Sequence, residues 1–387
     1  MGFQTASDDC IKKGRVTDVY FERVARSLEG RGINPLVSME VRATDLPGDW
    51  EWAIFAGLAE VLELAQELPV SLRALEEGDI FHAGEPVLQV SGKYLDFGVY
   101  ETAILGLICQ ASGIATSAAR CKHAAGERTV ISFGARRMHP ALAPMIERNA
   151  FVGGCDGVAV VESAVRIGEE PSGTMSHTLI LCARDERVAF EAFDESMGPD
   201  VKRIALVDTF QDEKFGALFA AEVLGEKLFA VRLDTPGSRR GDFPRIMEEV
   251  RWELDIRGFE DVKLFISGGI DEYKILDYNR CADAYGVGTH ISNSPVVNYS
   301  MDIVEIDGVP MAKRGKKSGL KQLWSCPSCG ARIQTLSSSD RPECRECGEE
   351  MKAMLSEKLD SGDRLSGDLT PRQIRSRVLE GLSTVRL

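Results

Sequence analysis

The sequence predicts an α/β protein built around an irregular parallel α/β barrel, with an N-terminal mixed α/β sandwich domain and a small C-terminal zinc-knuckle domain. The main observation is that six short apolar runs each end in polar, glycine or arginine residues and are each followed by a segment of helical length. Parallel strands read as continuous apolar runs because both faces of the sheet are buried. The runs are Thr129 to Arg136, Val158 to Glu162, Ile204 to Thr209, Leu228 to Asp234, Val262 to Gly269 and Ala284 to Thr289.

The elements on either side of the barrel give a division into residues 1–115, 116–295 and 296–387. Upstream, the amphipathic stretch from Trp52 to Leu68 predicts a helix that Pro69 stops. Downstream, Asp307-Gly308 is a favoured tight-turn pair and predicts a hairpin, and a terminal helix closes the chain. The other expected upstream elements are three short strands and one long helix, at Val70 to Leu75, Asp79 to Ala83, Val87 to Val90 and Leu95 to Ala119.

The composition restricts the partners that this chain can have. A net charge of −14 and a pI near 5.0 argue against a protein that coats nucleic acid through broad electrostatics, so an anionic ligand must be held by a local basic cluster. The N-terminus has no apolar core of signal-peptide length, and we expect no apolar run of membrane-spanning length. The sequence therefore predicts a cytoplasmic protein with no membrane partner.

Four cysteines near the C-terminus form two C-x2-C pairs, Cys326 with Cys329 and Cys344 with Cys347, each followed by glycine. A tight turn of this kind points two thiolates at one ion, and four sulfur ligands make a closed tetrahedral zinc site. The alternative is a set of redox-active or unpaired cysteines. Because the set leaves no open position for water, we expect the zinc to be structural.

The residues at the carboxyl ends of the six runs are candidates for chemistry, because barrel enzymes keep their active sites there. Arginines, aspartates and paired glycines together suggest a sugar phosphate ligand. The residues expected at these ends are Phe133, Arg136, Asp156, Asp208, Arg232, Asp234, Gly268, Gly269, Gly286 and Gly288.

Two glycine turns are the candidate phosphate site: Ser267-Gly268-Gly269 and Gly286-Val287-Gly288-Thr289. Glycine lets backbone N–H groups approach a phosphate closely, and the helix that follows adds its positive dipole. Either turn alone is also compatible with an ordinary strand-to-helix connection. Two such turns in successive units favour the phosphate site.

Two further groups of residues carry charge or aromatic faces. Alternation along a strand places Arg232 and Asp234 on one side, where they suit a phosphate and ribose hydroxyls, or form a plain ion pair. Phe133 with Arg136 and Arg137 suits a flat charged heterocycle. His177 lies in a polar turn that includes Thr174, which favours a catalytic or phosphate-binding role over a core histidine. The predicted catalytic set is His177, Arg232, Asp234 and Asp208.

These motifs, in this order, resemble the nicotinate phosphoribosyltransferase family, and the resemblance extends over nearly the whole chain. It rests on Thr17-Asp18-Val19-Tyr20, FGARR, GGCDG, GTMSH, VDTFQDE, VRLD, SGGID, GVGTHIS and VEIDGVPMAKRGKKSG. The C-terminal cysteine pairs resemble an archaeal or bacterial branch. The resemblance implies transfer of phosphoribosyl from phosphoribosyl pyrophosphate, with magnesium, to nicotinate, releasing pyrophosphate and often stimulated by ATP.

The resemblance also implies roles for individual residues. Phe133 would stack on the pyridine ring, with Tyr20 of a second subunit on the other face of the ring, so that a homodimer or larger homo-oligomer shares its sites. Arg136 would contact the acyl group of the base. Arg232 and Asp234 would hold the ribosyl phosphate, and the two glycine turns the 5′-phosphate. His177 matches a histidine that family members phosphorylate with ATP.

Asp156 complicates the choice of base, because nicotinamide-specific relatives use an aspartate here to accept a hydrogen bond from the carboxamide. A carboxylate beside nicotinate is repulsive unless it is protonated, turned away, or paired with Arg136 or Arg137. Nicotinamide or quinolinate is therefore the alternative base. A more distant alternative, from the cysteine pairs beside the basic run Lys313 to Lys317, is a zinc-ribbon nucleic-acid-binding protein.

Overall fold

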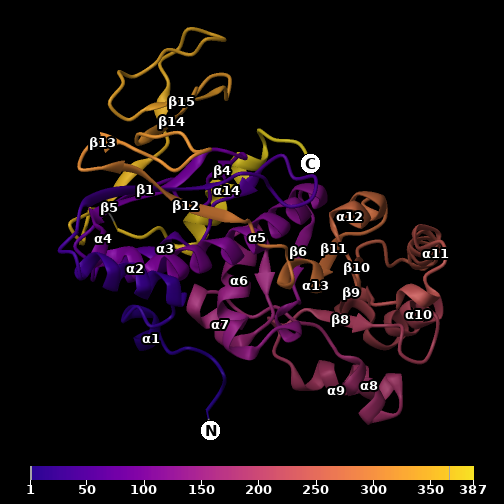
Figure 1. The fold of residues 1–387 in the computed structure, drawn as a ribbon. Coiled ribbons are helices and arrows are strands. Elements are labelled where there is room, and N and C mark those ends of the chain that lie inside the picture. The colour runs from indigo at the N-terminus through magenta and orange to yellow at the C-terminus, as the bar shows by residue number, and fades with distance from the viewer. Residues whose placement is uncertain (1, 366) are drawn as a thin grey trace. The chain divides into compact units, whose positions relative to one another are not determined.

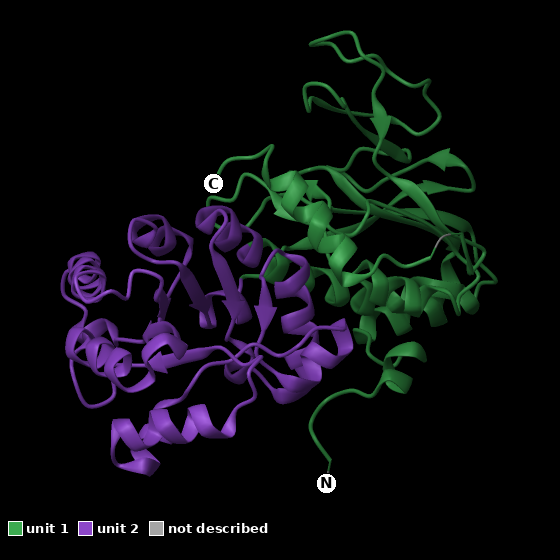
Figure 2. Cartoon of the chain, turned by 180° about the vertical axis from the view of Figure 1, so that it is seen from behind, with its two compact units in different colours: residues 1–116, 295–387 green, residues 117–294 purple. Residues whose placement is uncertain are grey.

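The computed structural model describes residues 2–365 and 367–387. Residues 117–294 form one compact unit, and the segments before and after them form the other (Figure 2). The division after residue 116 falls within helix α5 (Glu101–Ala125). The separate C-terminal domain that we expect from residue 296 stays a prediction.

The unit of residues 117–294 contains a curled parallel sheet whose six strands follow the six apolar runs of the sequence (Figure 1). The strand order is β7-β6-β11-β10-β9-β8, and the last strand, β11, pairs with the first, β6. Strands that are consecutive in the chain are therefore neighbours in the sheet, except for β7 and β8, where the barrel is open. The strands are β6 (Thr129–Ser132), β7 (Gly157–Val158), β8 (Arg203–Leu206), β9 (Leu228–Leu233), β10 (Lys263–Ser267) and β11 (Ala284–Val287). The predicted irregular parallel barrel is confirmed.

Helices alternate with these strands, and α10, α11 and α12 lie on the outer side of β8 to β11 (Figure 1). Four of the helices begin at an aspartate whose side chain accepts a hydrogen bond from a backbone N–H of the first turn: Asp185, Asp212, Asp242 and Asp271. Such N-caps fix where each strand-end loop stops and the helix starts. The helices are α6 (Ala143–Val152), α7 (Val161–Ile167), α8 (His177–Ala183), α9 (Glu186–Ser196), α10 (Glu213–Leu224), α11 (Phe243–Asp255), α12 (Glu272–Tyr278) and α13 (Thr289–Ser292).

The other unit is organised around a seven-stranded antiparallel sheet in the order β13-β12-β1-β5-β3-β17-β18. Its apolar core combines residues of β1, β3 and β5 with residues of α3 and α5. The sheet strands are β1 (Leu36–Ala43), β3 (Ser71–Ala74), β5 (Pro86–Lys93), β12 (Tyr299–Ile306), β13 (Val309–Pro310), β17 (Ser356–Asp360) and β18 (Asp363–Arg364). The predicted hairpin is the β12–β13 pair, with Asp307 and Gly308 at positive φ in its turn.

The remaining elements of this unit are helices and two small sheets, β2-β4 and β15-β14-β16. The helices are α1 (Asp8–Lys12), α2 (Val19–Glu29), α3 (Leu58–Ala65), α4 (Tyr94–Phe97), α5 and α14 (Pro371–Leu382). The small sheets are formed by β2 (Ala53–Ile54), β4 (Ile80–Phe81), β14 (Lys321–Ser325), β15 (Arg332–Leu336) and β16 (Lys352–Ala353).

The helix expected from Trp52 is wrong in its first part. Residues 53–54 form β2, and the helix begins only at Leu58, after Gly57 with a φ of +93°. A Cβ on Gly57 would lie 2.4 Å from the backbone oxygen of Leu107, so the chain approaches α5 more closely than any other residue permits.

The expectation that no apolar run has membrane-spanning length is also wrong. The helical stretch Tyr94–Ala125 is long and apolar enough by composition alone. However, 67% of its most apolar 18-residue window is buried inside the fold, which is the usual state of a core helix. The helix therefore gives only weak support for a membrane span.

Candidate active site

Arg232 and Asp234 lie at the carboxyl end of β9 and are joined through Ser267 at the end of β10. The guanidinium of Arg232 donates from Nε to Oγ of Ser267 (2.9 Å) and from Nη1 to Oγ1 of Thr174 (2.8 Å). Ser267 in turn donates to Oδ1 of Asp234 (2.6 Å), which lies 3.4 Å from Nη2 of Arg232. Four predicted site residues thus form one hydrogen-bonded cluster.

His177, the first residue of α8, adds a titratable ring to this cluster. Its Nδ1 lies 2.9 Å from Oγ1 of Thr209, and its Nε2 lies 3.7 Å from Oδ2 of Asp234 and 3.9 Å from Oδ1 of Asp208. The Asp208 side chain is only 6% exposed, and its Oδ1 has no hydrogen-bond partner among the described residues. Burial raises the pKa of Asp208, with His177 opposing the shift and Asp234 adding to it. A buried acceptor of this kind suits a cation or a proton.

Phe133 follows β6 and is fixed by both backbone and ring contacts. Its N–H donates to the carbonyl of Val287 (2.8 Å), and its ring meets Phe265 edge-on with the centroids 5.8 Å apart. The Arg232 guanidinium lies 5.2 Å from the Phe133 ring centroid, which links the aromatic face to the charged cluster. A Cβ on Gly286 would lie 2.4 Å from Cε2 of Phe133, so Gly286 leaves room for the ring. The sequence did not reveal this role of Gly286.

The two predicted phosphate turns differ in geometry. Gly268 and Gly269 have φ values of +83° and +62°, in the left-handed region that favours glycine. Gly288 has open space around its Cα, and Thr289 after it is exposed at the start of α13. Gly268, Gly269 and Thr289 are exposed, whereas Gly286 and Val287 are buried.

Arg240 is a site residue that the sequence reasoning missed. Its side chain is buried, and it donates to the backbone oxygens of Thr235 (2.8 Å), Ser267 (2.7 Å) and Gly268. It thus ties the loop after Asp234 to the first glycine turn. No strand-end pattern marks it, because it lies in the middle of a loop.

The predicted partner of the heterocycle, Arg136, is in the 3-10 turn Ala135–Arg137 directly after Phe133. Arg136 and Arg137 are both exposed, and neither forms an ion pair within the described part of the chain. They are two exposed cations that lie within four residues of Phe133 in the sequence.

Asp156 precedes β7 and forms an ion pair with Lys122 of α5. The possibilities that the sequence left open for Asp156, pairing with Arg136 or Arg137 among them, stay predictions. Oδ2 of Asp156 accepts from Nζ of Lys122 (2.9 Å) and from the backbone N–H of Val130 (2.8 Å). Lys122 also donates to the backbone oxygen of Arg128 (2.8 Å), and its pairing with Asp156, 34 residues away, is not shown by the sequence spacing.

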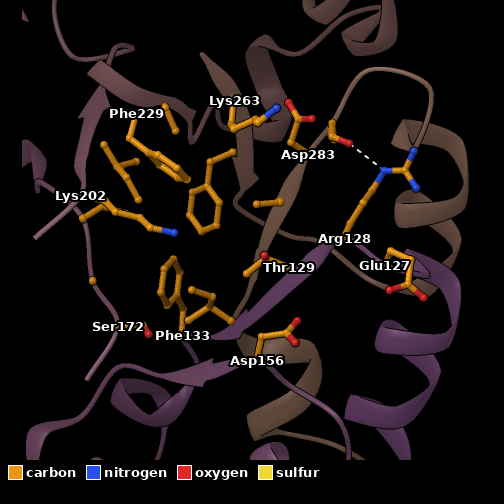
Figure 3. A pocket seen from close by; sticks show the side chains of 18 of the residues that line it. Glu127, Arg128, Thr129, Phe133, Asp156, Ser172, Lys202, Phe229, Lys263 and Asp283 are labelled. Carbon is orange, nitrogen blue, oxygen red and sulfur yellow. Dashed lines mark hydrogen bonds between the residues drawn. The ribbon is translucent and has the colours of Figure 1, made fainter. Parts of the chain in front are cut away.

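Asp156 and Phe133 line one cavity of about 1290 Å³ that opens at the amino ends of the strands (Figure 3). The start of every strand contributes a lining residue: Thr129, Asp156, Lys202, Phe229, Lys263 and Asp283 are among them. Figure 3 shows Phe133, Asp156 and Ser172 on one side, with Lys202, Phe229 and Lys263 across from them. The barrel interior is thus hollow from its amino end to the Phe133 ring.

The four cysteines of the C-terminal pairs lie together. Their sulfur atoms are 3.4 Å apart for Cys326 and Cys347, 3.5 Å for Cys329 and Cys344, and 3.8 Å for Cys347 and Cys329. All four could hold one metal ion. A tetrahedral site with Zn–S bonds of about 2.3 Å has edges of about 3.8 Å, so these distances fit zinc.

Comparison with known proteins identifies the family. Residues 18–112 match the quinolinate phosphoribosyl transferase N-terminal domain, and residues 114–302 match the C-terminal domain. The chain is 30% identical over 357 residues to nicotinate phosphoribosyltransferase pncB1 of Mycobacterium tuberculosis, covering 80% of this chain and 78% of that protein. The chain belongs to the nicotinate phosphoribosyltransferase family. The resemblance inferred from the motifs is thereby confirmed.

Two crystal structures relate the family to this fold. Nicotinate-nucleotide pyrophosphorylase from Pyrococcus furiosus is 48% identical, with a TM-score of 0.97 over 99% of this chain and 98% of that one. Human nicotinic acid phosphoribosyltransferase is 19% identical with a TM-score of 0.77, covering 96% of this chain and 94% of that one, and so shares the fold. The individual roles assigned to site residues within the family, including that of the exposed Tyr20 on α2, stay predictions.

Proposed function

We propose that this protein is a nicotinate phosphoribosyltransferase, which joins nicotinate to phosphoribosyl pyrophosphate and yields nicotinate mononucleotide and pyrophosphate in NAD biosynthesis. The observation that carries the proposal is the Arg232–Ser267–Asp234 cluster beside the Phe133 ring. It puts a charged group suited to a ribosyl phosphate next to an aromatic face suited to a pyridine ring.

In this proposal the chain supplies position and charge rather than acid–base chemistry. The nucleophile is a ring nitrogen and the leaving group is pyrophosphate, so orientation and stabilisation of a cationic ribosyl centre would supply most of the rate. Arg232 and Asp234 would hold the ribosyl phosphate, with Thr174 and Ser267 fixing the Arg232 side chain. The turns at Gly268-Gly269 and Gly286-Val287-Gly288-Thr289 would take the 5′-phosphate.

Magnesium would enter with the pyrophosphate substrate. Asp208 and Asp234 offer two carboxylates, and the buried Oδ1 of Asp208 is an acceptor without a hydrogen-bond partner among the described residues, which fits a hard cation. ATP is the proposed activator, through phosphorylation of His177, whose ring is 40% exposed.

The finer features of the proposal concern metal, assembly and location. Cys326, Cys329, Cys344 and Cys347 would hold a structural zinc, supported by the sulfur distances. A homodimer or larger homo-oligomer would share its sites through Tyr20, and the enzyme would act in the cytoplasm without nucleic-acid or membrane partners.

The nearest alternative changes only the base, to nicotinamide or quinolinate; Asp156 supports the amide and the two matched domain families support quinolinate. The test is an assay with purified protein, magnesium and phosphoribosyl pyrophosphate, given each of the three bases separately, with pyrophosphate release followed. We expect nicotinate to give the highest kcat/KM. A higher value for either other base would replace nicotinate, and turnover of none would reject the proposal.

A further inference from the structure

One buried side chain fixes the backbone of the first glycine turn. The guanidinium of Arg240 donates from Nη2 to the backbone oxygens of Ser267 (2.7 Å) and Gly268, and from Nε to that of Thr235 (2.8 Å). Its Cζ lies 4.8 Å from the ring centroid of Phe243. Three carbonyls and an aromatic ring thus hold this planar group in one orientation.

The carbonyl contacts decide where the N–H groups of the turn point. A peptide group is planar and trans, so its N–H points away from its C=O. Because Arg240 holds the oxygens of Ser267 and Gly268 on one side, the N–H groups of Gly268 and Gly269 point to the opposite side. Neither N–H donates to another group within the described part of the chain. Successive backbone N–H groups in such a turn are suited to an anion.

The turn also lies directly against the charged cluster. A Cβ on Gly268 would lie 3.1 Å from both Nη2 of Arg240 and Oδ1 of Asp234, and Gly268 has a φ of +83°. Only glycine lets the two side chains approach the turn this closely. The turn is therefore fixed in position relative to Asp234, which in the proposed function holds the ribosyl phosphate.

Lys274 of α12 holds the next carbonyl of the turn. Its Nζ donates to the backbone oxygen of Gly269 and lies 3.7 Å from Oδ2 of Asp271. The Lys274 side chain is 43% exposed, so water competes for this contact more than for those of Arg240. We expect Lys274 to support the turn and Arg240 to fix it.

We propose that Arg240 is a positioning residue, which orients the N–H groups of Gly268 and Gly269 to bind the 5′-phosphate of phosphoribosyl pyrophosphate. This role rests on the proposed function, because it concerns the substrate of that reaction. The 5′-phosphate takes no part in the bond that breaks, so contacts with it stabilise the bound substrate and the transition state alike. Loss of such contacts raises KM and leaves kcat nearly unchanged.

Steady-state kinetics of Arg240→Ala and Arg245→Ala test this role. Both variants lose one positive charge, but Arg245 is exposed on α11, after the same loop, and does not contact the turn. We expect Arg240→Ala to raise KM for phosphoribosyl pyrophosphate at least about 10-fold, with kcat and KM for nicotinate within about threefold of wild type. Arg245→Ala should match wild type, and Lys274→Met should raise KM less than Arg240→Ala. An unchanged KM in Arg240→Ala, or a loss of kcat in place of the rise in KM, would overturn the proposal.

Chemical rescue separates orientation of the turn from charge alone. Millimolar guanidinium should lower the KM of Arg240→Ala, because the ion can stack on Phe243 and donate to the same carbonyls. Methylammonium carries the charge without the planar donors and should not, so equal rescue by both ions would count against the role. Thermal melting shows whether each variant is folded. If Arg240→Ala does not fold, Arg240→Lys takes its place, and a wild-type KM in that variant overturns the proposal.

Equilibrium binding of ribose 5-phosphate, measured by isothermal titration calorimetry, needs no turnover. The dissociation constant should be at least about 10-fold higher for Arg240→Ala than for wild type. Equal constants, or no binding by wild type, would overturn the role of Arg240. Wild-type protein that binds ribose 5-phosphate but turns over no base would reject the proposed function alone.

Discussion

The hydroxyl of Ser267 donates a 2.6 Å hydrogen bond to Oδ1 of Asp234, joining the ends of neighbouring strands β9 and β10. The same hydroxyl accepts a hydrogen bond from Arg232, so one serine holds both charged side chains in place. Neither charged side chain is in the apolar core, which makes them suitable for substitution.

We predict that Arg232→Ala or Asp234→Ala nearly abolishes turnover while the fold stays intact. Loss of one charged partner in a dry site costs about 2.7 to 4 kcal/mol of transition-state stabilisation, or a 100- to 1000-fold drop in kcat. Steady-state kinetics and circular dichroism measure the two effects. Arg245→Ala, at an exposed arginine on α11, is the matched control and should be neutral. Activity within about threefold of wild type for both site variants would refute the assignment.

Gly286→Ala should lower kcat/KM for the base without exposing the core. A Cβ at this position would lie 2.4 Å from the Phe133 ring, so the ring must turn or shift. Because near-attack geometry depends on ring position, we expect kcat/KM for the base to fall at least 10-fold. Gly106→Ala, on α5, where nothing lies within 4 Å of the added atom, is the comparison. Equal activity of the two variants would show that the Phe133 position is unimportant.

The C-terminal cysteines should hold one zinc ion per chain, measurable by elemental analysis of protein purified without chelators. A closed four-sulfur site contributes folding energy and no chemistry, so Cys326→Ser with Cys344→Ser should lower the melting temperature yet leave the preference between bases unchanged. Cys281→Ser, at a cysteine outside the cluster, is the control. Protein that contains no metal would end this interpretation.

Glu272 should make stability depend on acid pH. Burial alone would raise the pKa of Glu272, but contacts with His290 (2.6 Å) and Arg120 (2.8 Å) outweigh it and lower the pKa to about 2. A lowered folded-state pKa stabilises the protein above the unfolded value near 4.5, and the gain is lost as pH falls towards 2.

Urea unfolding of wild type and Glu272→Gln at several pH values measures this contribution. The stability difference should be on the order of 1 to 3 kcal/mol above pH 5, and should shrink as the pH falls below about 4.5. Glu248→Gln, at a half-exposed carboxylate, should show little change. A difference between wild type and Glu272→Gln that is constant with pH would contradict the pKa assignment.

Sharing of the active site between subunits predicts complementation. Tyr20→Ala and Asp234→Ala proteins should each be nearly inactive, but a mixed dimer would contain one site with both defects and one with neither. After random subunit exchange, activity should return to about a quarter of wild type, because half of the dimers have one good site of two. No recovery, with exchange confirmed by mass spectrometry, would mean that Tyr20 serves its own chain or is structural.

The barrel could be predicted from the sequence because its strands are short apolar runs that end in polar residues. Each strand is buried on both faces, so its apolar run is visible in the local sequence. The cluster of Arg232, Asp234 and Ser267 could also be predicted, because the carboxyl ends of parallel strands lie at the same edge of the sheet. Motif order alone also indicated the family.

Other features depend on contacts between distant segments, which a single sequence does not display. Strand β1 was missed although it pairs with both β5 and β12, because no motif marks it. Lys122 is 34 residues from Asp156, and Arg240 is 27 residues from Ser267, so neither pairing could be read from local spacing. The helix start at Leu58 depends on the close approach of Gly57 to α5.

The central claim is tested most directly by identifying the product. Purified protein is incubated with magnesium, phosphoribosyl pyrophosphate and an equimolar mixture of nicotinate, nicotinamide and quinolinate, and the nucleotides formed are separated and identified by mass. The account predicts that nicotinate mononucleotide is the main product, in a 1:1 ratio to pyrophosphate, and that it disappears when nicotinate alone is left out. Formation of nicotinamide mononucleotide as the main product, or of nicotinate mononucleotide only when quinolinate is present, would contradict it.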